Sequence, residues 1–259
     1  MKNFFEEIDF KKYSSIKIGP ICEVLNINEI GYYDDYQIIG QANNILVSNT
    51  PPKFAKLGKA FEYIEQKDDK LYVGCAVKSG KLLSYAKKHD LANFEFLGRL
   101  PGNLGGLIKM NAGLKEWEIF NYIDSIKTKD GYIKKEDIQY GYRFTNINTI
   151  VYELVFNLSS GYSKEKSEMF KKMRDNQPHT PSAGSCFKNP EGDYAGRLIE
   201  QVGLKGLKKG DMSFSKVHAN FLVNEGEGTF EDAMYLINEA KNRIKEQFNI
   251  EIQEEIIIF

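Results

Sequence analysis

Cysteine and histidine are scarce in this chain, and neither is arranged for chemistry. Its three cysteines are scattered without a C-x-x-C spacing, and its three histidines share no metal-ligand spacing. These patterns argue against a disulfide framework and against a zinc site, so we expect no bound metal. Reduced, unpaired cysteines are typical of cytosolic proteins, bacterial or eukaryotic.

Long apolar runs and an excess of charge are also missing. No stretch reaches the roughly 18 apolar residues of a membrane span, and the first residues become charged too early for a secretory signal. The 35 basic and 36 acidic residues give a net charge of −1, which supplies no overall field to hold a nucleic acid. We therefore expect a soluble protein with no membrane insertion and no nucleic-acid partner.

The patterns that are present predict an α+β fold. With 259 residues and 42% hydrophobic content, the chain has room for two domains or for one large domain with an inserted lobe. Short runs predict strands at 36–39, 45–48, 54–57, 61–65 and 71–74, and longer runs predict strands at 119–129, 149–158, 215–224 and 250–259. Helical patterns follow Ser79, Ser163, Asp193 and Thr229, each of which we expect to cap or begin its helix.

The stretch from Pro181 to Pro190 carries an unusual mixture of side chains. A hydroxyl, an ammonium and a carboxamide stand at Ser185, Lys188 and Asn189 between two prolines, and Gly184 permits a tight bend before the serine. An extended backbone would let Ser185 and Asn189 face a common cavity. The alternative is a polar loop of ordinary turn residues.

Two small-residue segments are candidates for a pyrophosphate cradle. The first is the turn Gly40, Ala42, Asn43 and Asn44 before Ile45 and Leu46. The second contains Pro101, Gly102, Gly105 and Gly106 and continues to Asn111, Ala112 and Gly113. Such segments let backbone amides face an anion, and they lack the Cβ atoms that would keep a ligand away. Each could instead be a simple turn, and neither matches a Rossmann or P-loop motif.

Charged residues elsewhere suggest anion recognition. Arg143 follows Tyr142 in an aromatic segment, where its planar fork could grip a carboxylate or phosphate, although a surface ion pair is the simpler interpretation. Lys205, between two loop glycines, could reach a substrate phosphate. Glu254 and Glu255 are adjacent in the last predicted strand, so one of them should point inward.

In this order and spacing, these landmarks resemble the UDP-N-acetylenolpyruvoylglucosamine reductase family over nearly the whole chain. The matching segments are 13–19, the asparagine turn with 45–47, the Pro101 loop running to 113, Tyr142–Arg143, 184–190, 195–200, 203–206, 218–221 and Glu255. The resemblance implies a vanillyl-alcohol-oxidase-type FAD-binding fold of two subdomains plus an α+β substrate domain. The implied boundaries are 1–52 and 53–160 for FAD, 161–249 for substrate, and 250–259 for a strand carrying the glutamate.

The implied reaction is the reduction, in bacterial peptidoglycan precursor synthesis, of the enolpyruvyl ether of a UDP-sugar. NADPH would pass hydride through FAD to the substrate in a cytoplasmic monomer. The two glycine-rich segments would hold the FAD. Arg143 and Glu255 would stabilise charge on the substrate carboxylate, and Ser185 would donate the proton. Tyr142, Lys188, Asn189, Lys205 and His218 would hold the substrate.

The chain departs from the family pattern at Arg99, at Ala42–Asn43 and at Glu254, so Glu254 stays an alternative to Glu255. It also lacks the insertion with a substrate-clamping tyrosine, which favours the subgroup without it. Two other functions remain open. One is a flavin oxidase of the same superfamily, and the other is a flavin- or nucleotide-binding module without catalysis.

Overall fold

The computed structural model describes residues 1–259 and contains two compact units, each made from separate stretches of chain. Unit 1 comprises Met1–Glu6, Glu23–Gln41 and Lys53–Asp175, and unit 2 comprises Glu7–Cys22, Ala42–Pro52 and Asn176–Phe259. Residues 7–22 and 42–52 therefore group with the C-terminal part of the chain. The four-part division from the sequence stays a prediction.

Unit 1 is built around an antiparallel sheet in the order β11-β10-β14-β7-β6. The strands are β6 (Ile64–Lys67), β7 (Lys70–Gly74), β10 (Ile123–Thr128), β11 (Gly131–Lys134) and β14 (Glu153–Asn157). The central strand of this sheet is β14, and it buries Leu154, Val155 and Phe156 alike. A strand covered on both faces does not alternate between apolar and polar residues.

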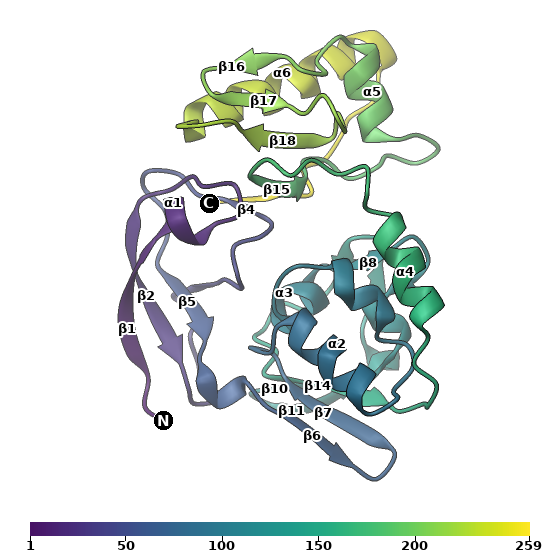
Figure 1. Ribbon diagram of the computed structural model, residues 1–259. Coiled ribbons are helices and arrows are strands. Elements are labelled where there is room, and N and C mark those ends of the chain that lie inside the picture. The colour runs from purple at the N-terminus through teal and green to yellow at the C-terminus, as the bar shows by residue number, and fades with distance from the viewer. The chain divides into compact units, whose positions relative to one another are not determined.

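Helices lie along one face of this sheet (Figure 1). They are α2 (Ser79–Lys88), α3 (Leu104–Lys109), α4 (Lys164–Lys172) and the 3-10 helix η2 (Glu95–Arg99). Leu82, Leu97, Leu104 and Phe170 from these helices join Phe156 of the sheet in one apolar core. The helix α3 is packed in this core, so it fixes the position of one end of the glycine-rich loop that precedes it.

Unit 1 also contains smaller elements. A second sheet has the order β1-β2-β5-β3, and the remaining strands form two hairpins. The bounds are β1 (Phe4–Asp9), β2 (Ile21–Ile27), β3 (Gln37–Ile38), β5 (Phe54–Leu57), β8 (Gly113–Leu114), β9 (Trp117–Glu118), β12 (Tyr140–Gly141) and β13 (Phe144–Thr145), with 3-10 turns η1 (Lys59–Phe61), η3 (Ile119–Asn121) and η4 (Lys135–Asp137). Residues 7–9 of β1 and 21–22 of β2 belong to unit 2.

Unit 2 is a four-stranded sheet in the order β15-β18-β17-β16, with α5 and α6 packed on it. The bounds are α1 (Phe10–Tyr13), β4 (Ile45–Leu46), β15 (Ser182–Ser185), α5 (Ala195–Gln201), β16 (Lys208–Lys209), β17 (Met212–Phe214), β18 (Phe221–Asn224), α6 (Phe230–Phe248) and β19 (Ile257–Ile258). The predicted helix α6 is confirmed: the Thr229 side chain accepts from Asp232 N, and Ala233, Ile237, Ala240 and Ile244 are fully buried along one stripe.

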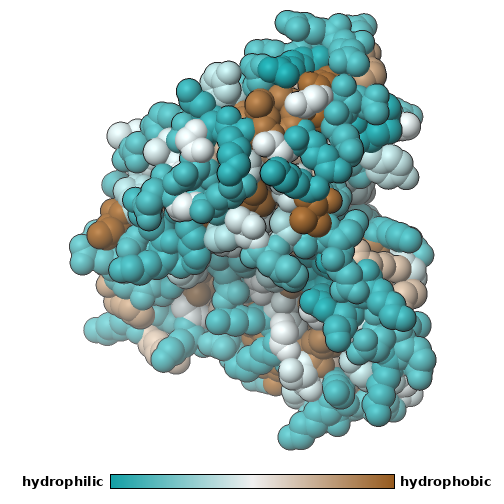
Figure 2. All heavy atoms as spheres, turned by 45° about the horizontal axis from the view of Figure 1, so that its top comes forward, coloured by the Kyte–Doolittle hydropathy of each residue, from teal (hydrophilic) through white to brown (hydrophobic).

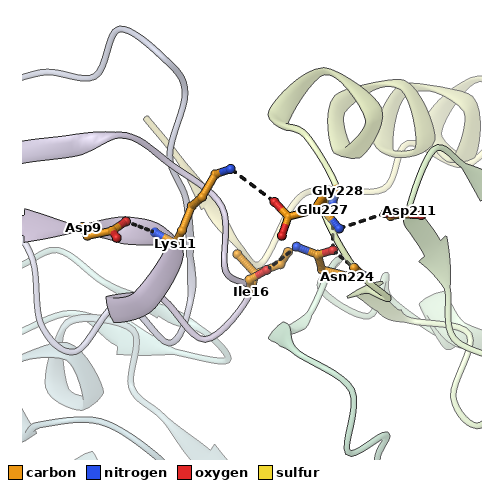
Figure 3. Close-up of polar contacts among 8 residues, drawn as sticks. Asp9, Lys11, Ile16, Asp211, Asn224, Glu227 and Gly228 are labelled. Atoms are coloured by element: carbon orange, nitrogen blue, oxygen red, sulfur yellow. Dashed lines mark hydrogen bonds and ion pairs between the residues drawn. The ribbon is translucent and has the colours of Figure 1, made fainter.

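The early segment of unit 2 is tied to the turn after β18 by polar contacts (Figure 3). Asn224 Nδ2 donates to the Ile16 carbonyl at 3.1 Å, and Asn224 Oδ1 accepts from Gly228 N at 3.0 Å. Lys11 pairs with Glu227 at 3.4 Å on the exposed side of the same turn. The buried asparagine contributes more than the exposed ion pair, which solvent screens.

Hydrophilic residues cover most of the face drawn in Figure 2, and the hydrophobic ones form small groups between them. No helix of the structure combines the length and the apolar character that a bilayer crossing needs.

Several predicted element ends are wrong for physical reasons. Ser79 does not cap α2; its hydroxyl donates instead to the Leu100 carbonyl at 2.5 Å. Asp193 does not cap α5, because Tyr194 takes that place while the Asp193 carboxylate binds Arg197. Ser163 does cap α4, accepting from Lys166 N at 3.1 Å, although that helix ends at Lys172.

Other predicted strands are shorter than expected. The strands predicted at 61–65 and 119–129 start late because Lys59–Phe61 and Ile119–Asn121 form 3-10 turns. Only Phe221–Asn224 of 215–224 is a strand, since the Ser215 hydroxyl holds a turn by accepting from Val217 N at 3.1 Å. In the last predicted strand, 250–259, only Ile257–Ile258 pairs as a strand.

Candidate active site

Ser185 stands at the end of β15, where the strand pairs with Phe221 of β18. Gly184 before it has φ +80°, which only glycine adopts at little cost. After the serine, the chain stays attached to β18, because Cys186 N donates to the Asn220 carbonyl at 2.7 Å. Ser185 is half-buried, and rigid backbone flanks it on both sides.

The Asn220 side chain binds the backbone of Phe187, two residues after Ser185. Its Nδ2 donates to the Phe187 carbonyl at 2.7 Å, and its Oδ1 accepts from Phe187 N at 3.0 Å. Both residues are buried, so the carboxamide satisfies two backbone groups that water cannot reach. The position of Ser185 therefore depends on an asparagine 35 residues further along the chain.

The C-terminal segment reaches the same place. Glu255 N donates to the Cys186 carbonyl at 2.9 Å, and Lys188 N donates to the Gln253 carbonyl at 2.8 Å. The Glu254 carboxylate pairs with Lys241 of α6 at 2.8 Å. Glu255 lies in the bend that follows. Because the Glu254 carboxylate is held by α6, Glu255 stays the candidate glutamate.

The first glycine- and asparagine-rich turn meets the terminal glutamate in unit 2. Asn44 Nδ2 donates to the Glu255 carbonyl at 2.9 Å, and β4 pairs in parallel with β19 through Ile45–Ile257 and Leu46–Ile258. Ala42 has φ +51°, and its carbonyl accepts from Ser15 N at 3.1 Å. Unit 2 thus joins the turn at 42–46, the serine strand and the glutamate, three segments that are far apart in the sequence.

Two of the residues predicted to hold the substrate, Asn189 and His218, contact the start of α5. The Asn189 Oδ1 accepts from Ala195 N at 3.1 Å, so this carboxamide provides a partner for the first backbone N–H of the helix. The ring of His218 lies against Gly196, where a Cβ would come 3.3 Å from its Cε1. Lys205 pairs with Glu200 at 3.0 Å on the surface. Lys188 stands two residues before Pro190, and its side chain is partly buried.

Burial sets the electrostatics of two side chains in this part of unit 2. It lowers the pKa of His218, and nearby Lys205 lowers it further. The imidazole is therefore neutral at pH 7, and its Nδ1 accepts from Asn220 N at 3.3 Å. Burial also raises the pKa of the Cys186 thiol, with Glu254 and Glu255 adding to the effect. Cys186 is thus an inert core residue beside the serine.

In unit 1, the second glycine-rich segment leads into α3, a helix that the sequence patterns missed. Asn103 caps it by accepting from Gly106 N at 3.1 Å, and Gly105 N donates to the Cys75 carbonyl at 3.0 Å. The expectation that these two amides face an anion is wrong, because both bond within the protein. The glycines contribute instead by leaving out side chains where the loop passes over the core.

Within unit 1, Gly40 of the first predicted cradle segment lies against Asn103 of the second. A Cβ on Gly40 would lie 2.6 Å from the Asn103 Oδ1, so only glycine lets the first turn approach the capping asparagine. Gly102, next to it, has φ +125°. Ser79 holds this loop through its hydroxyl bond to Leu100 and through its backbone N, which donates to the Gly102 carbonyl at 3.0 Å.

Arg143 lies at the tip of the hairpin β12–β13 in unit 1, with φ +53°. Its Nη2 donates to the Gly113 carbonyl at 3.2 Å, and its guanidinium lies 5.1 Å from the centre of the Tyr142 ring. Tyr142 is exposed. The segment 111–113 predicted for the cofactor therefore also contacts the candidate arginine. The Asn111 side chain is wholly buried and bonded to protein, which leaves only its backbone for a cofactor contact.

The protein contacts by which Asn103, Asn111, Asn220 and Ser79 support these segments were not predicted from the sequence. The available signal was a polar residue between apolar neighbours, as in Ala219-Asn220-Phe221, which indicates a buried carboxamide with backbone partners. That signal does not say which backbone the carboxamide binds.

Comparisons with known proteins agree with this arrangement. The family model described as UDP-N-acetylenolpyruvoylglucosamine reductase, C-terminal domain, matches residues 176–259. Proteins named UDP-N-acetylenolpyruvoylglucosamine reductase from Campylobacter jejuni and Helicobacter hepaticus are 45% and 44% identical to the chain. Both alignments cover 97% of this chain, and they cover 99% and 97% of the relatives.

A solved structure agrees as well. The crystal structure of UDP-N-acetylenolpyruvylglucosamine reductase from Thermus caldophilus matches with a TM-score of 0.85 and 27% identity over 100% of both chains. These full-length matches define the class: the chain is an oxidoreductase of α+β architecture. It belongs to the UDP-N-acetylenolpyruvoylglucosamine reductase family, so the resemblance predicted from its sequence is confirmed.

Proposed function

We propose that the protein uses NADPH and FAD to reduce UDP-N-acetylglucosamine enolpyruvate to UDP-N-acetylmuramate in peptidoglycan precursor synthesis. The observation that carries the proposal is the meeting of three segments in unit 2. The serine strand, the terminal glutamate and the asparagine turn are joined by the bonds of Cys186 to Glu255 and of Glu255 to Asn44. Family membership supports the same reaction.

The residues present fit FAD. In unit 1, Gly40 lets the chain pass close to Asn103, where a Cβ would come 2.6 Å from the Asn103 Oδ1. In unit 2, Ala42 adopts φ +51° to turn the chain before β4. The cofactor would lie against the turn at Gly40, Ala42, Asn43, Asn44, Ile45 and Leu46, the loop at Pro101, Gly102, Gly105 and Gly106, and the backbone of Asn111, Ala112 and Gly113. A vanillyl-alcohol-oxidase-type fold of two FAD subdomains, 1–52 and 53–160, accounts for both segments.

When bound, FAD would supply the chemistry of hydride transfer from NADPH to the terminal vinyl carbon of the substrate. The electron pair of the carbon-carbon double bond then moves to the α-carbon and spreads into the substrate carboxylate. Arg143 and Glu255 stabilise that charge, Arg143 through its planar fork and Glu255 as a protonated donor. Ser185 Oγ gives its proton to the α-carbon, and the serine regains a proton from solvent.

The nucleotide-sugar would be held by Tyr142, Lys188, Asn189, Lys205 and His218. To bind a substrate phosphate, Lys205 must release Glu200. Breaking this ion pair costs little free energy, because the pair is exposed to solvent. His218 offers a neutral imidazole beside the N-terminal end of α5. We also propose residues 161–249 as a substrate domain, 250–259 as the glutamate-bearing strand, a monomeric state and a bacterial cytoplasmic location, consistent with three free cysteines.

The test separates the two half-reactions in a stopped-flow spectrometer. Ser185→Ala should keep flavin reduction by NADPH near the wild-type rate, because that step needs no proton from the serine. Reoxidation of the reduced flavin by the enolpyruvyl substrate should slow by about 10²–10⁴-fold. Ser182→Ala, in the same strand, is the matched control and should leave both steps unchanged.

Three results would contradict the proposal. Equal slowing of both half-reactions in Ser185→Ala would reject the serine as proton donor. Recovery of flavin colour in the wild type only with oxygen would indicate an oxidase of the same superfamily. A bound flavin that NADPH does not bleach would indicate a binding module without catalysis.

A further inference from the structure

We propose that Asn111 is a positioning residue: its buried carboxamide fixes the hairpin that carries Arg143 and so determines where the guanidinium meets the substrate carboxylate. The inference rests on the proposed role of Arg143. It assigns to Asn111 a task different from contact with the cofactor.

The carboxamide of Asn111 is bonded in three directions. Its Nδ2 donates to Glu118 Oε2 at 2.7 Å and to the Gly141 carbonyl at 3.0 Å, and its Oδ1 accepts from Phe120 N at 3.3 Å. The side chain has two N–H donors, and these two acceptors use both. The side chain is fully buried, so water cannot replace any of these partners. The bond to Gly141 is the one that reaches the arginine hairpin.

The hairpin cannot fix its own position. Its strands β12 and β13 are two residues each and pair only with each other, and a short isolated hairpin is marginally stable in water. Gly141 is the last residue before the Tyr142–Arg143 tip. A bond from buried Asn111 to that carbonyl therefore holds the hairpin directly beside the arginine.

Other contacts attach the same hairpin to the same segment. Thr145 Oγ1 donates to the Lys109 carbonyl at 2.8 Å, and the ring of Tyr140 stacks on Phe120 with centres 4.5 Å apart. Arg143 itself donates to the Gly113 carbonyl at 3.2 Å. Residues 109–120 thus form a platform on which both strands and the tip of the hairpin rest.

Asparagine suits position 111 for two reasons. The residue has φ +44°, a left-handed conformation that asparagine adopts more easily than most side chains. An aspartate at this position would place a second carboxylate against Glu118 and would lack a donor for Gly141. The requirement is therefore for a carboxamide, with its donors facing Glu118 and the hairpin.

The first experiment needs no activity. Trypsin cuts after arginine, and cleavage of a folded protein follows the local opening of the segment around the bond. Asn111→Gly removes the side chain without straining the backbone at positive φ. It should speed tryptic cleavage after Arg143, identified by fragment mass. Asn121→Ala is the matched control, since Asn121 also donates to a backbone carbonyl, that of Glu116 at 2.7 Å, but does not contact the hairpin.

The second experiment measures the chemistry. Asn111→Gly should slow flavin reoxidation by substrate about 10–100-fold, as expected for a displaced catalytic group, and should leave reduction by NADPH and flavin affinity near wild type. Combined with Arg143→Lys, the two effects should not multiply, because both act through one guanidinium. Thr145→Val cuts another attachment and should give a smaller effect of the same kind, which keeps the test possible should the glycine variant fold poorly.

Unchanged cleavage after Arg143 in Asn111→Gly would overturn the inference. Equal slowing of both half-reactions with loss of flavin, or fully multiplicative effects, would also overturn it and return Asn111 to the cofactor site. If Arg143→Lys alone leaves reoxidation unchanged, the role of Arg143 in the proposed function fails, while the cleavage result still decides whether Asn111 holds the hairpin.

Discussion

Replacing Asn220 by alanine should weaken unit 2 more than the loss of one polar side chain suggests. The change removes the donor to the Phe187 carbonyl and the acceptor for Phe187 N, at 2.7 and 3.0 Å. Phe187 is fully buried, so both of its backbone groups lose their partner without gaining water. Each buried backbone group that loses its hydrogen-bond partner lowers the free energy of unfolding by about 1–3 kcal/mol, which gives about 2–6 kcal/mol for the two groups.

The free energy of unfolding is measured by urea denaturation followed by circular dichroism, with Asn238→Ala as the control. Asn238 is an exposed residue of α6, and its replacement should change stability by less than about 0.5 kcal/mol. The Asn220→Ala loss corresponds to a melting temperature roughly 5–20 °C lower. A loss for Asn220→Ala that is no larger than that of the control would refute the reasoning.

An isosteric change tests the same bonds through pH. Asn220→Asp keeps the acceptor for Phe187 N but turns an oxygen toward the Phe187 carbonyl, so burial and this carbonyl should raise the pKa of the new carboxyl in the folded state. Stability from its protonated form is then present below the unfolded pKa of about 3.9 and is lost as pH rises through the folded value. Relative to wild type, the variant should recover stability on acidification. No recovery would mean that the carboxamide does not donate to Phe187.

Two further predictions concern unit 1. Gly40→Ala should weaken FAD binding, because the new methyl group would lie 2.6 Å from the Asn103 Oδ1 and push the two cradle segments apart. The flavin affinity of the variant and of the wild type is measured by fluorescence titration. An unchanged affinity would show that the segments do not hold the cofactor. Tyr63 and Tyr132 both donate to Glu153, and burial followed by that carboxylate raises the pKa of each phenol. Their contribution to stability is present below about pH 10 and is lost as pH rises above it. When the wild type unfolds at high pH, both phenols ionise and the tyrosinate absorbance at 295 nm rises. In Tyr63→Phe, this rise on unfolding should be smaller by the contribution of one phenol. An unchanged rise would contradict the assignment.

Local rules predicted those parts of the fold that depend on neighbouring residues. Thr229 and Ser163 cap helices as expected, because a capping side chain needs only a backbone N–H two or three residues away. The helix predicted after Thr229 is likewise confirmed as α6, and its apolar stripe is buried. Ser79 shows the limit of such rules, since its hydroxyl has a distant partner at Leu100 that no local pattern encodes.

The helix α3 was missed because Gly105 and Gly106 lower its intrinsic helical propensity. Burial of Leu104, Leu107 and Ile108 overrides that cost. Tertiary contacts of this kind are invisible in a single sequence.

The candidate site was predictable in composition but not in assembly. Ser185, Arg143 and Glu255 were singled out by their residue types and by the family resemblance. Their supports were not, because the bond from Asn44 to Glu255 spans 211 positions and the bonds from Asn220 to Phe187 span 33. Contacts at such separations follow from the completed fold and leave no periodic trace in the chain.

The pairing of β4 with β19 also bears on the order of folding. It joins Ile45 to Ile257 and Leu46 to Ile258, so a very long loop must close before these two residues gain a strand partner and the adjoining turn is connected to Glu255. Pairing between such distant segments forms slowly. We therefore expect unit 2 to complete its structure late in folding, when Phe259 N bonds to the Leu46 carbonyl.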